Sequence, residues 1–133
     1  AEIRRGLIFT NLVDFDMLYG HRLDAEGFGR ALEAFDSWLP RLMRSMGSKD
    51  LLVITADHGC DPTMAGTDHT REDVPLLVWH PEIAEGGSLG VRRSFADLGA
   101  TVAEVFGADP GEGESFLGKL WQDRGPNGCC VEA

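Results

Sequence analysis

Two polar clusters in this sequence carry side chains of the types that bind divalent metal ions in proteins. The first, "DFDMLYGH", contains Asp16 and His21. The second, "TADHGCDPTMAGTDHT", contains Asp57, His58 and His69 and directly follows the apolar run "LLVI". Two carboxylates and three imidazoles form a mixed oxygen and nitrogen set, which suits Mn²⁺ or Zn²⁺ better than Ca²⁺ or Mg²⁺. The set is larger than one tetrahedral zinc requires and is suited to a pair of ions that clamps a phosphoryl group.

The same side chains also have a plainer interpretation. Asp57, His58 and His69 would then be hydrogen-bonded residues of a polar loop, and Asp16 and His21 would belong to a solvated turn. For Asp16 and His21 the residues alone favour neither interpretation. Gly20 and Gly59 stand beside the candidate ligands, where each would let the backbone turn sharply.

Other polar residues near the clusters are expected to have supporting or unrelated roles. Asp61 and Asp68 are predicted to orient ligands rather than to bind metal, with plain solvation as the alternative for Asp68. Asp14 is predicted to orient a ligand or to have a structural role. Cys60 is expected to be a small packed residue and His80 a surface residue. Arg22 and Arg71 could meet a phosphate, but surface ion pairs are the more common role of such arginines.

The order of the predicted elements indicates an α/β fold with a mostly parallel sheet and flanking helices. Short apolar runs predict buried strands at Leu7–Val13, Leu51–Thr55 and Val74–Trp79. Apolar residues at steps of three and four predict a helix over Glu26–Met46, with a kink or break near Leu39 caused by Pro40. A second helix is predicted over Ser94–Gly107. Ligands in such sheets gather at the carboxyl ends of strands, where both clusters are expected.

Length and composition fit one domain, with no run long enough to span a bilayer and no secretory signal. The net charge of −10 disfavours nucleic acid as a partner, and phosphate chemistry would need metal ions to reverse the local charge. The odd set of Cys60, Cys129 and Cys130 predicts a reduced, cytoplasmic setting. The first residue is not Met, so we expect the sequence to begin within a longer protein.

Three stretches resemble the phosphopentomutase family, which belongs to the alkaline phosphatase-like metalloenzymes. They are "FTNLVDFDMLYGHR", "ITADHGCDPTMAGTDHTREDVPLLV" and "SLGVRRSFADLGATVAE". The resemblance implies that residues 1–133 form the C-terminal part of the metal-binding core domain. The cap domain and the N-terminal part of the core would then be absent.

The resemblance also implies an activity and a ligand set. The family interconverts ribose 1-phosphate and ribose 5-phosphate, and the deoxy forms, with two Mn²⁺ ions and a sugar bisphosphate activator. By resemblance, Asp57 and His58 bind one ion, and Asp16, His21 and His69 bind the other. Zn²⁺ is a possible substitute.

The nucleophilic threonine of the family would lie in the missing N-terminal part, because no threonine here matches its motif. We therefore expect no catalytic nucleophile in this chain and no turnover by the chain alone. The missing part would be a partner, beside the phosphorylated pentose substrate. Former interior surface would be exposed, with Trp38, Trp79 and Trp121 as candidates, leading to aggregation or partner binding.

Two alternatives stay open. A cofactor-independent phosphoglycerate mutase or a phosphatase of the same superfamily would share the "ADHG" loop and the later "HT". The chain could also be a non-catalytic fragment, or a subunit completed by a separate chain.

Overall fold

A computed structural model of the chain describes residues 5–83 and 86–121. It divides into two compact units, one built from Ala1–Met46 and Val53–Val78 and the other from Gly47–Leu52 and Trp79–Ala133. Cys129, Cys130 and the first residues, on which the expectations of a reduced setting and an upstream part were based, lie outside the described residues.

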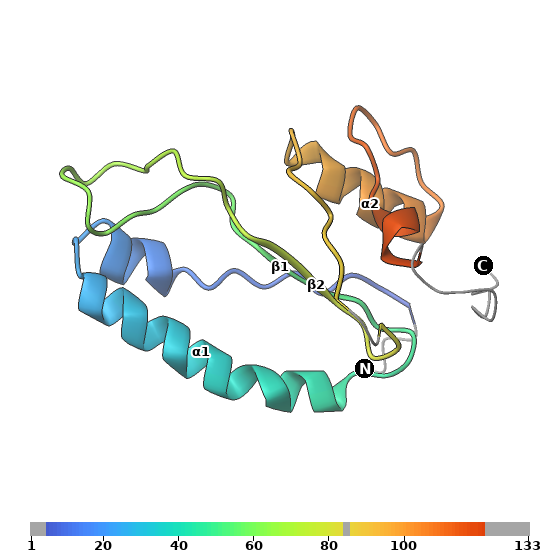
Figure 1. Cartoon of the computed structure of the whole chain (residues 1–133), viewed down its shortest axis with the longest axis horizontal. Coiled ribbons are helices and arrows are strands. Elements are labelled where there is room, and N and C mark those ends of the chain that lie inside the picture. The colour runs from blue at the N-terminus through green and yellow to red at the C-terminus, as the bar shows by residue number, and fades with distance from the viewer. Residues whose placement is uncertain (1–4, 84–85, 122–133) are drawn as a thin grey trace. The chain divides into compact units, whose positions relative to one another are not determined.

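The first unit contains a short π-helix followed by the longest helix of the described chain (Figure 1). The π-helix η1 spans Phe15–Gly20, and α1 spans Ala25–Ser45. Asp24 caps α1, since its side chain accepts a 2.8 Å hydrogen bond from the N–H of Gly27. Of the kink or break predicted near Leu39, the break is wrong, because Pro40 lies inside a continuous helix. Proline removes a single N–H donor, and the helical turns on both sides of it persist.

Strands β1, Leu52–Thr55, and β2, Leu76–Trp79, form a two-stranded sheet. Two of the predicted strands are therefore confirmed, but they are not buried as predicted: no residue of either strand is fully buried, and Leu77 is 59% exposed. The chain leaves β1, passes through a long loop and returns to β2, so the strands run in opposite directions (Figure 1). An antiparallel bridge between Gly59 and Thr70 joins the two arms of this loop. The described residues thus contain a hairpin where the sequence predicted a mostly parallel sheet. Apolar runs locate strands but do not encode their direction.

The predicted strand at Leu7–Val13 is absent from the described structure. Its residues have no regular secondary structure up to Leu12, and their large side chains are exposed, Phe9 to 85%. A strand needs a hydrogen-bonded neighbour, and no strand of the described chain pairs with this segment. The apolar sequence typical of a strand is present, but the described chain offers it no neighbouring strand.

The second unit is built around helix α2, Ala96–Phe106, and the short 3₁₀ helix η2, Leu117–Trp121. Ala100 and Phe116 are its fully buried apolar residues. Gly107 ends α2 in the left-handed conformation, with φ of 69°, a position that glycine adopts without strain. The predicted second helix is confirmed, but it begins two residues later and ends one residue earlier than predicted.

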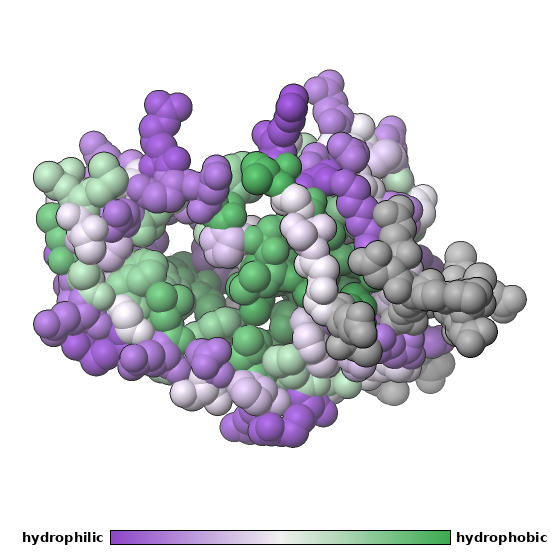
Figure 2. Space-filling model, in the orientation of Figure 1, coloured by the Kyte–Doolittle hydropathy of each residue, from purple (hydrophilic) through white to green (hydrophobic). Residues whose placement is uncertain are grey.

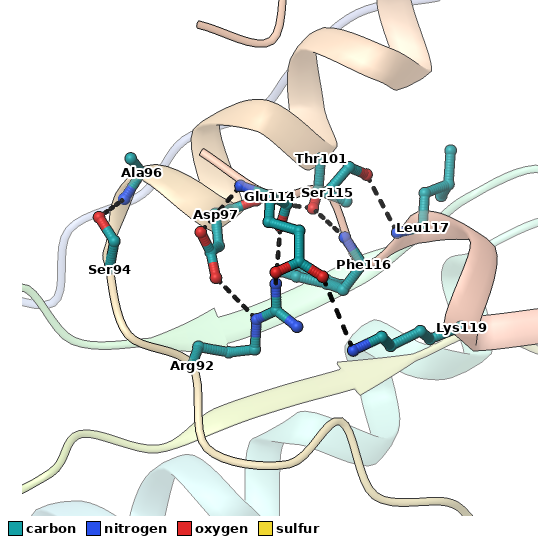
Figure 3. Close-up of polar contacts among 10 residues, drawn as sticks. All are labelled: Arg92, Ser94, Ala96, Asp97, Thr101, Glu114, Ser115, Phe116, Leu117 and Lys119. Carbon is teal, nitrogen blue, oxygen red and sulfur yellow. Dashed lines mark hydrogen bonds and ion pairs between the residues drawn. The ribbon is translucent and has the colours of Figure 1, made fainter. Parts of the chain in front are cut away.

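Polar contacts fix the turn before α2 and the turn after it (Figure 3). Nε of Arg92 donates to Asp97 Oδ2 at 2.7 Å, and the N–H of Glu114 donates to Asp97 Oδ1 at 2.9 Å. The hydroxyl of Thr101 donates to the carbonyl of Asp97 and accepts from the N–H of Phe116. Asp97 therefore bonds both the segment before α2 and the segment after it.

Large apolar side chains are exposed over much of the described chain, and Figure 2 shows hydrophobic surface open on the face it draws. Of the three tryptophans predicted to be exposed, Trp38 is half-exposed, and Trp79 and Trp121 are only partly accessible. No helix within residues 5–83 and 86–121 combines the length and apolarity needed to cross a membrane.

Candidate metal centre

Helix η1 brings Asp16 and His21 together. The N–H of His21 donates to the carbonyl of Asp16 at 2.9 Å, an i→i+5 hydrogen bond of the π-helix. As a result, Nε2 of His21 lies 3.3 Å from Asp16 Oδ2. Isolated π-helical turns are uncommon and often occur at functional sites. The pair was predicted to follow a strand, but Asp16 lies in the helix η1 and His21 is the residue that ends it.

The loop between β1 and β2 supplies the other candidate ligands. His58 and His69 lie on its opposite arms, next to the bridge between Gly59 and Thr70. Their rings stack with centroids 3.6 Å apart and planes 16° apart. The ring of His21 also stacks on His69, at 5.0 Å and 30°. Three imidazoles from two separate segments therefore form one group.

Asp16 lies at the centre of this group. Its Oδ1 is 3.4 Å from Nε2 of His69 and 4.0 Å from Nε2 of His58. One nitrogen or oxygen atom from each of Asp16, His58 and His69 lies within 4.8 Å of the others, a spacing that could hold a metal ion. All five residues singled out from the sequence belong to the first unit.

Asp57 lies at the edge of the group. Its Oδ1 is 3.6 Å from Nε2 of His58, but its side chain is 87% exposed. Among the described residues, Asp57 forms no ion pair with any other candidate ligand. Of the five candidate ligands, Asp57 is therefore the one whose position is least constrained by contacts with other residues.

Backbone carbonyls orient two of the histidines. Nδ1 of His58 lies 3.0 Å from the carbonyl oxygen of Gly59, and Nδ1 of His21 contacts the carbonyl of Thr67. A carbonyl oxygen can only accept, so Nδ1 carries the proton in both rings. In the neutral imidazole, Nε2 then presents a lone pair, as metal-binding histidines do. Asp61 and Asp68 were predicted to orient the ligands, but the backbone carbonyls of Gly59 and Thr67 take this role for His58 and His21.

The atoms that face one another at the centre are all acceptors when the histidines are neutral. Asp16 Oδ1 is buried and has no hydrogen-bond partner in the described chain. Buried polar atoms without partners are rare and costly in folded proteins. A cation, either a proton on the imidazoles or a metal ion, would satisfy this oxygen and the Nε2 lone pairs together. The donor set of carboxylate oxygen and imidazole nitrogen fits Mn²⁺ or Zn²⁺.

The neighbouring polar residues have different contacts. The carboxylate of Asp61 accepts from the N–H and hydroxyl of Thr63, which lowers the pKa of Asp61 below its ordinary value. Asp14 precedes η1 and makes no side-chain cap. Burial, followed by the negative charges of Asp16, Glu72 and Asp61, raises the pKa of Cys60. The thiol therefore stays protonated and packs against Gly20, where a Cβ would overlap Sγ.

His80 is not the surface residue that the sequence suggested. It is 5% exposed, and its ring packs edge-on against Trp121 with centroids 4.8 Å apart. Nδ1 of His80 accepts from the N–H of Glu82. It belongs to the second unit, whereas the candidate ligands belong to the first.

Comparison with known proteins identifies one family, and the relatives described below are all phosphopentomutases. The family described as the metalloenzyme superfamily matches residues 2–110. A phosphopentomutase of Syntrophotalea carbinolica is 63% identical over 120 residues, which are 90% of this chain and 31% of that protein. A phosphopentomutase of Carboxydothermus hydrogenoformans is 59% identical over 86% of this chain and 30% of that protein. One of Clostridium novyi is 55% identical over 90% of this chain and 31% of that protein. The chain thus spans about a third of the length of the curated relatives it matches.

Proposed function

The chain belongs to the metalloenzyme superfamily, and on that premise we propose that it carries most of the ligands of a two-ion centre in a phosphopentomutase. Such an enzyme interconverts ribose 1-phosphate and ribose 5-phosphate, and the deoxy forms. Relatives of that name at 55–63% identity support this function. Each of these relatives matches at least 86% of the chain.

One observation carries the metal part of the proposal: Asp16 Oδ1 is buried without a hydrogen-bond partner, facing Nε2 of His69 and His58. A second carboxylate, Asp57, lies against His58, and a third imidazole, His21, lies against Asp16. These groups would form a mixed oxygen and nitrogen cage for Mn²⁺, with Zn²⁺ as the alternative.

The residues would divide between the ions as the resemblance implies. Asp57 and His58 would hold one ion, and Asp16, His21 and His69 the other. The proximity of Asp16 Oδ1 to both His58 and His69 places this carboxylate where it could serve either ion. Bound metal would neutralise phosphate charge and stabilise in-line transfer of the phosphoryl group.

The chain's own contribution is the precise placement of these ligands. The carbonyls of Gly59 and Thr67 hold two imidazoles with Nε2 directed towards Asp16. Hydrogen bonds of this kind fix the tautomer and raise the basicity of the ring. Preorganised ligands avoid a reorganisation cost when phosphate binds.

The nucleophilic threonine and the cap domain would come from the roughly 70% of the relatives' length that this chain does not match. A sugar bisphosphate activator and a reducing, cytoplasmic setting are part of the same proposal, and the free thiol of Cys60 is compatible with that setting. The exposed apolar segment Leu7–Val13 would then be a strand of a larger, mostly parallel sheet. The isolated chain would be inactive.

A hybrid enzyme tests the function directly. This chain would replace the matching 31% of the Syntrophotalea carbinolica relative. We expect the hybrid to convert ribose 1-phosphate to ribose 5-phosphate with Mn²⁺, and His58→Ala or His21→Ala to abolish turnover. Arg30→Ala, which removes only an exposed ion pair with Glu26, serves as control. A folded hybrid without mutase activity would contradict the proposal.

The rivals make different predictions in the same assay. A phosphoglycerate mutase or phosphatase would act on phosphoglycerate or on a simple phosphate ester in preference to the pentose phosphate. A non-catalytic module, which the partial coverage of the relatives keeps open, would leave the hybrid inactive while this chain alone still bound metal.

A further inference from the structure

Thr70 joins the two arms of the loop between β1 and β2 through two hydrogen bonds, and a third hydrogen bond ties its hydroxyl to Glu72 on its own arm. Its N–H donates to the carbonyl of Gly59 at 3.1 Å, and its hydroxyl oxygen accepts from the N–H of Asp61 at 2.8 Å. Its hydroxyl proton goes to Glu72 Oε2. We call these three contacts the Thr70 junction. The hydroxyl is used as donor and acceptor at once, which valine, of the same shape, cannot do.

The Thr70 junction lies one residue from each of two candidate ligands. His58 precedes Gly59, and His69 precedes Thr70. The carbonyl of Gly59 accepts from Thr70 N–H and also from Nδ1 of His58. The distance between the arms and the tautomer of His58 therefore depend on the same acceptor, the carbonyl oxygen of Gly59. The 3.6 Å separation of the His58 and His69 rings is the geometric result.

The close approach of the arms depends on glycine at position 59. A Cβ there would lie 2.6 Å from the carbonyl oxygen of Thr70 and 2.8 Å from the N–H nitrogen of Glu72. Both are backbone atoms, which cannot rotate away as a side chain can. Glycine at position 59 has no side chain, and its backbone can therefore approach the opposite arm this closely.

We infer that Thr70 is a positioning residue for the metal centre, acting through the Thr70 junction on His58 and His69. The inference rests on the proposed metal centre. Loss of the hydroxyl leaves the N–H of Asp61 without its acceptor and the carboxylate of Glu72 without its donor. Water would compete for both groups, and the arms would separate. The imidazoles would then lose their shared orientation towards Asp16.

Four variants of the chain test this role. Thr70→Val removes the hydroxyl and keeps the shape, whereas Thr70→Ser keeps the hydroxyl. Glu72→Ala removes only the acceptor of the hydroxyl proton. Thr63→Val is the matched control, because the hydroxyl of Thr63 bonds the carboxylate of Asp61 in the same loop but not the opposite arm. Circular dichroism reports whether helix α1 remains folded in each.

Two measurements are made on every variant. Calorimetric titration with Mn²⁺ gives the metal affinity. Nitrogen-15 spectra of the metal-free chain at pH 8 report which ring nitrogen of His58 carries the proton. Partners that orient metal ligands typically change affinity by about 10- to 100-fold when removed. We expect a loss of that size for Thr70→Val and a smaller one for Glu72→Ala. We expect no more than about threefold for Thr70→Ser and Thr63→Val, which keep the orienting contacts.

The tautomer of His58 separates the inference from the proposed function. In the wild type and in Thr70→Ser we expect the proton on Nδ1, and in Thr70→Val a mixture of the two tautomers. A wild-type chain that binds no Mn²⁺ would refute the metal centre, and the tautomer spectra would still decide the role of Thr70. A folded Thr70→Val chain with unchanged metal affinity and an unchanged tautomer would overturn the inference. If Thr70→Val does not fold, unchanged values in Glu72→Ala overturn it instead.

Discussion

Nε2 of His69 lies 3.4 Å from Oδ1 of Asp16, although one residue belongs to the loop between the strands and the other to η1. Asp16 Oδ1 has no hydrogen-bond partner in the described chain. The contact ties two segments that are distant in the sequence. It is the geometric basis for the first two predictions below.

Replacing Asp16 by Asn should weaken Mn²⁺ binding by at least about tenfold, since removal of an outer partner alone often has that effect. The amide is neutral and keeps the shape of the carboxylate. Calorimetric titration of the chain measures the change. Asp14→Asn, two residues earlier and without a side-chain cap, should leave affinity unchanged. Equal affinities in wild type and Asp16→Asn would argue against this carboxylate as a ligand.

Mn²⁺ should raise the thermal stability of the chain, because a ligand that binds the folded state stabilises it by mass action. At a free concentration a hundred times its Kd, the gain is about 2.7 kcal/mol. Thermal unfolding with and without Mn²⁺ measures it, and a chelator should reverse it. Ca²⁺ prefers all-oxygen sites and should shift the midpoint less. An identical shift in His58→Ala would show that the ion binds elsewhere.

Thr101→Val should destabilise the second unit by about 1–3 kcal/mol, the usual cost of a buried donor without an acceptor. Thr101 is 1% exposed, and its hydroxyl is the acceptor for the N–H of Phe116 at 3.0 Å. Native-state hydrogen exchange of the α2 amides follows this unit specifically. Thr101→Ser keeps the hydroxyl and should show a smaller loss. Equal protection in the valine variant would mean that water replaces the contact.

The second unit should lose stability in acid through Asp97. Hydrogen bonding from the N–H of Glu114, opposed by burial and supported by Arg92, holds the pKa of Asp97 below its ordinary value. A lowered folded pKa means that the stabilisation is complete above the unfolded pKa of about 3.9 and is lost as pH falls through the folded pKa. Exchange protection of α2 should therefore decrease as the pH is lowered from about 5 through the folded pKa of Asp97.

Two variants separate this titration from general acid effects. Asp97→Asn should be less stable at pH 6 and should show a flatter pH dependence. Asp109→Asn should follow the wild type, because the carboxylate of Asp109 accepts an exposed hydrogen bond from the N–H of Gly111. A wild-type profile in Asp97→Asn would remove Asp97 as the source of the acid sensitivity.

The exposed apolar segment before η1 should promote self-association of the isolated chain. Leu7, Ile8 and Phe9 are all largely exposed, and exposed apolar patches favour association. Sedimentation velocity should show association that rises with concentration and decreases in an Ile8→Lys, Phe9→Lys variant. Val91→Lys changes another exposed apolar residue and should have little effect. Equal association in all three would place the contact on a different surface.

The sequence by itself determined the local elements and the chemical types of the candidate ligands. The apolar stripe of α1, the run that forms β1 and the glycine that ends α2 are each encoded within a few neighbouring residues. Asp16, His21, Asp57, His58 and His69 were also found this way, because carboxylates and imidazoles are recognisable wherever they stand. Their role as metal ligands stays a prediction.

Only the tertiary structure decided how these parts meet. It placed Asp16 at the centre of three imidazoles, made Gly59 and Thr67 the groups that orient them, and assigned Thr70 to the point where the loop arms join. It also buried His80, left Leu7–Val13 exposed and paired β1 with β2 as a hairpin. The physical reason is that strand direction, burial and backbone acceptors depend on which distant segment closes against which. Loop closure of that kind leaves no periodic signature in the residues themselves.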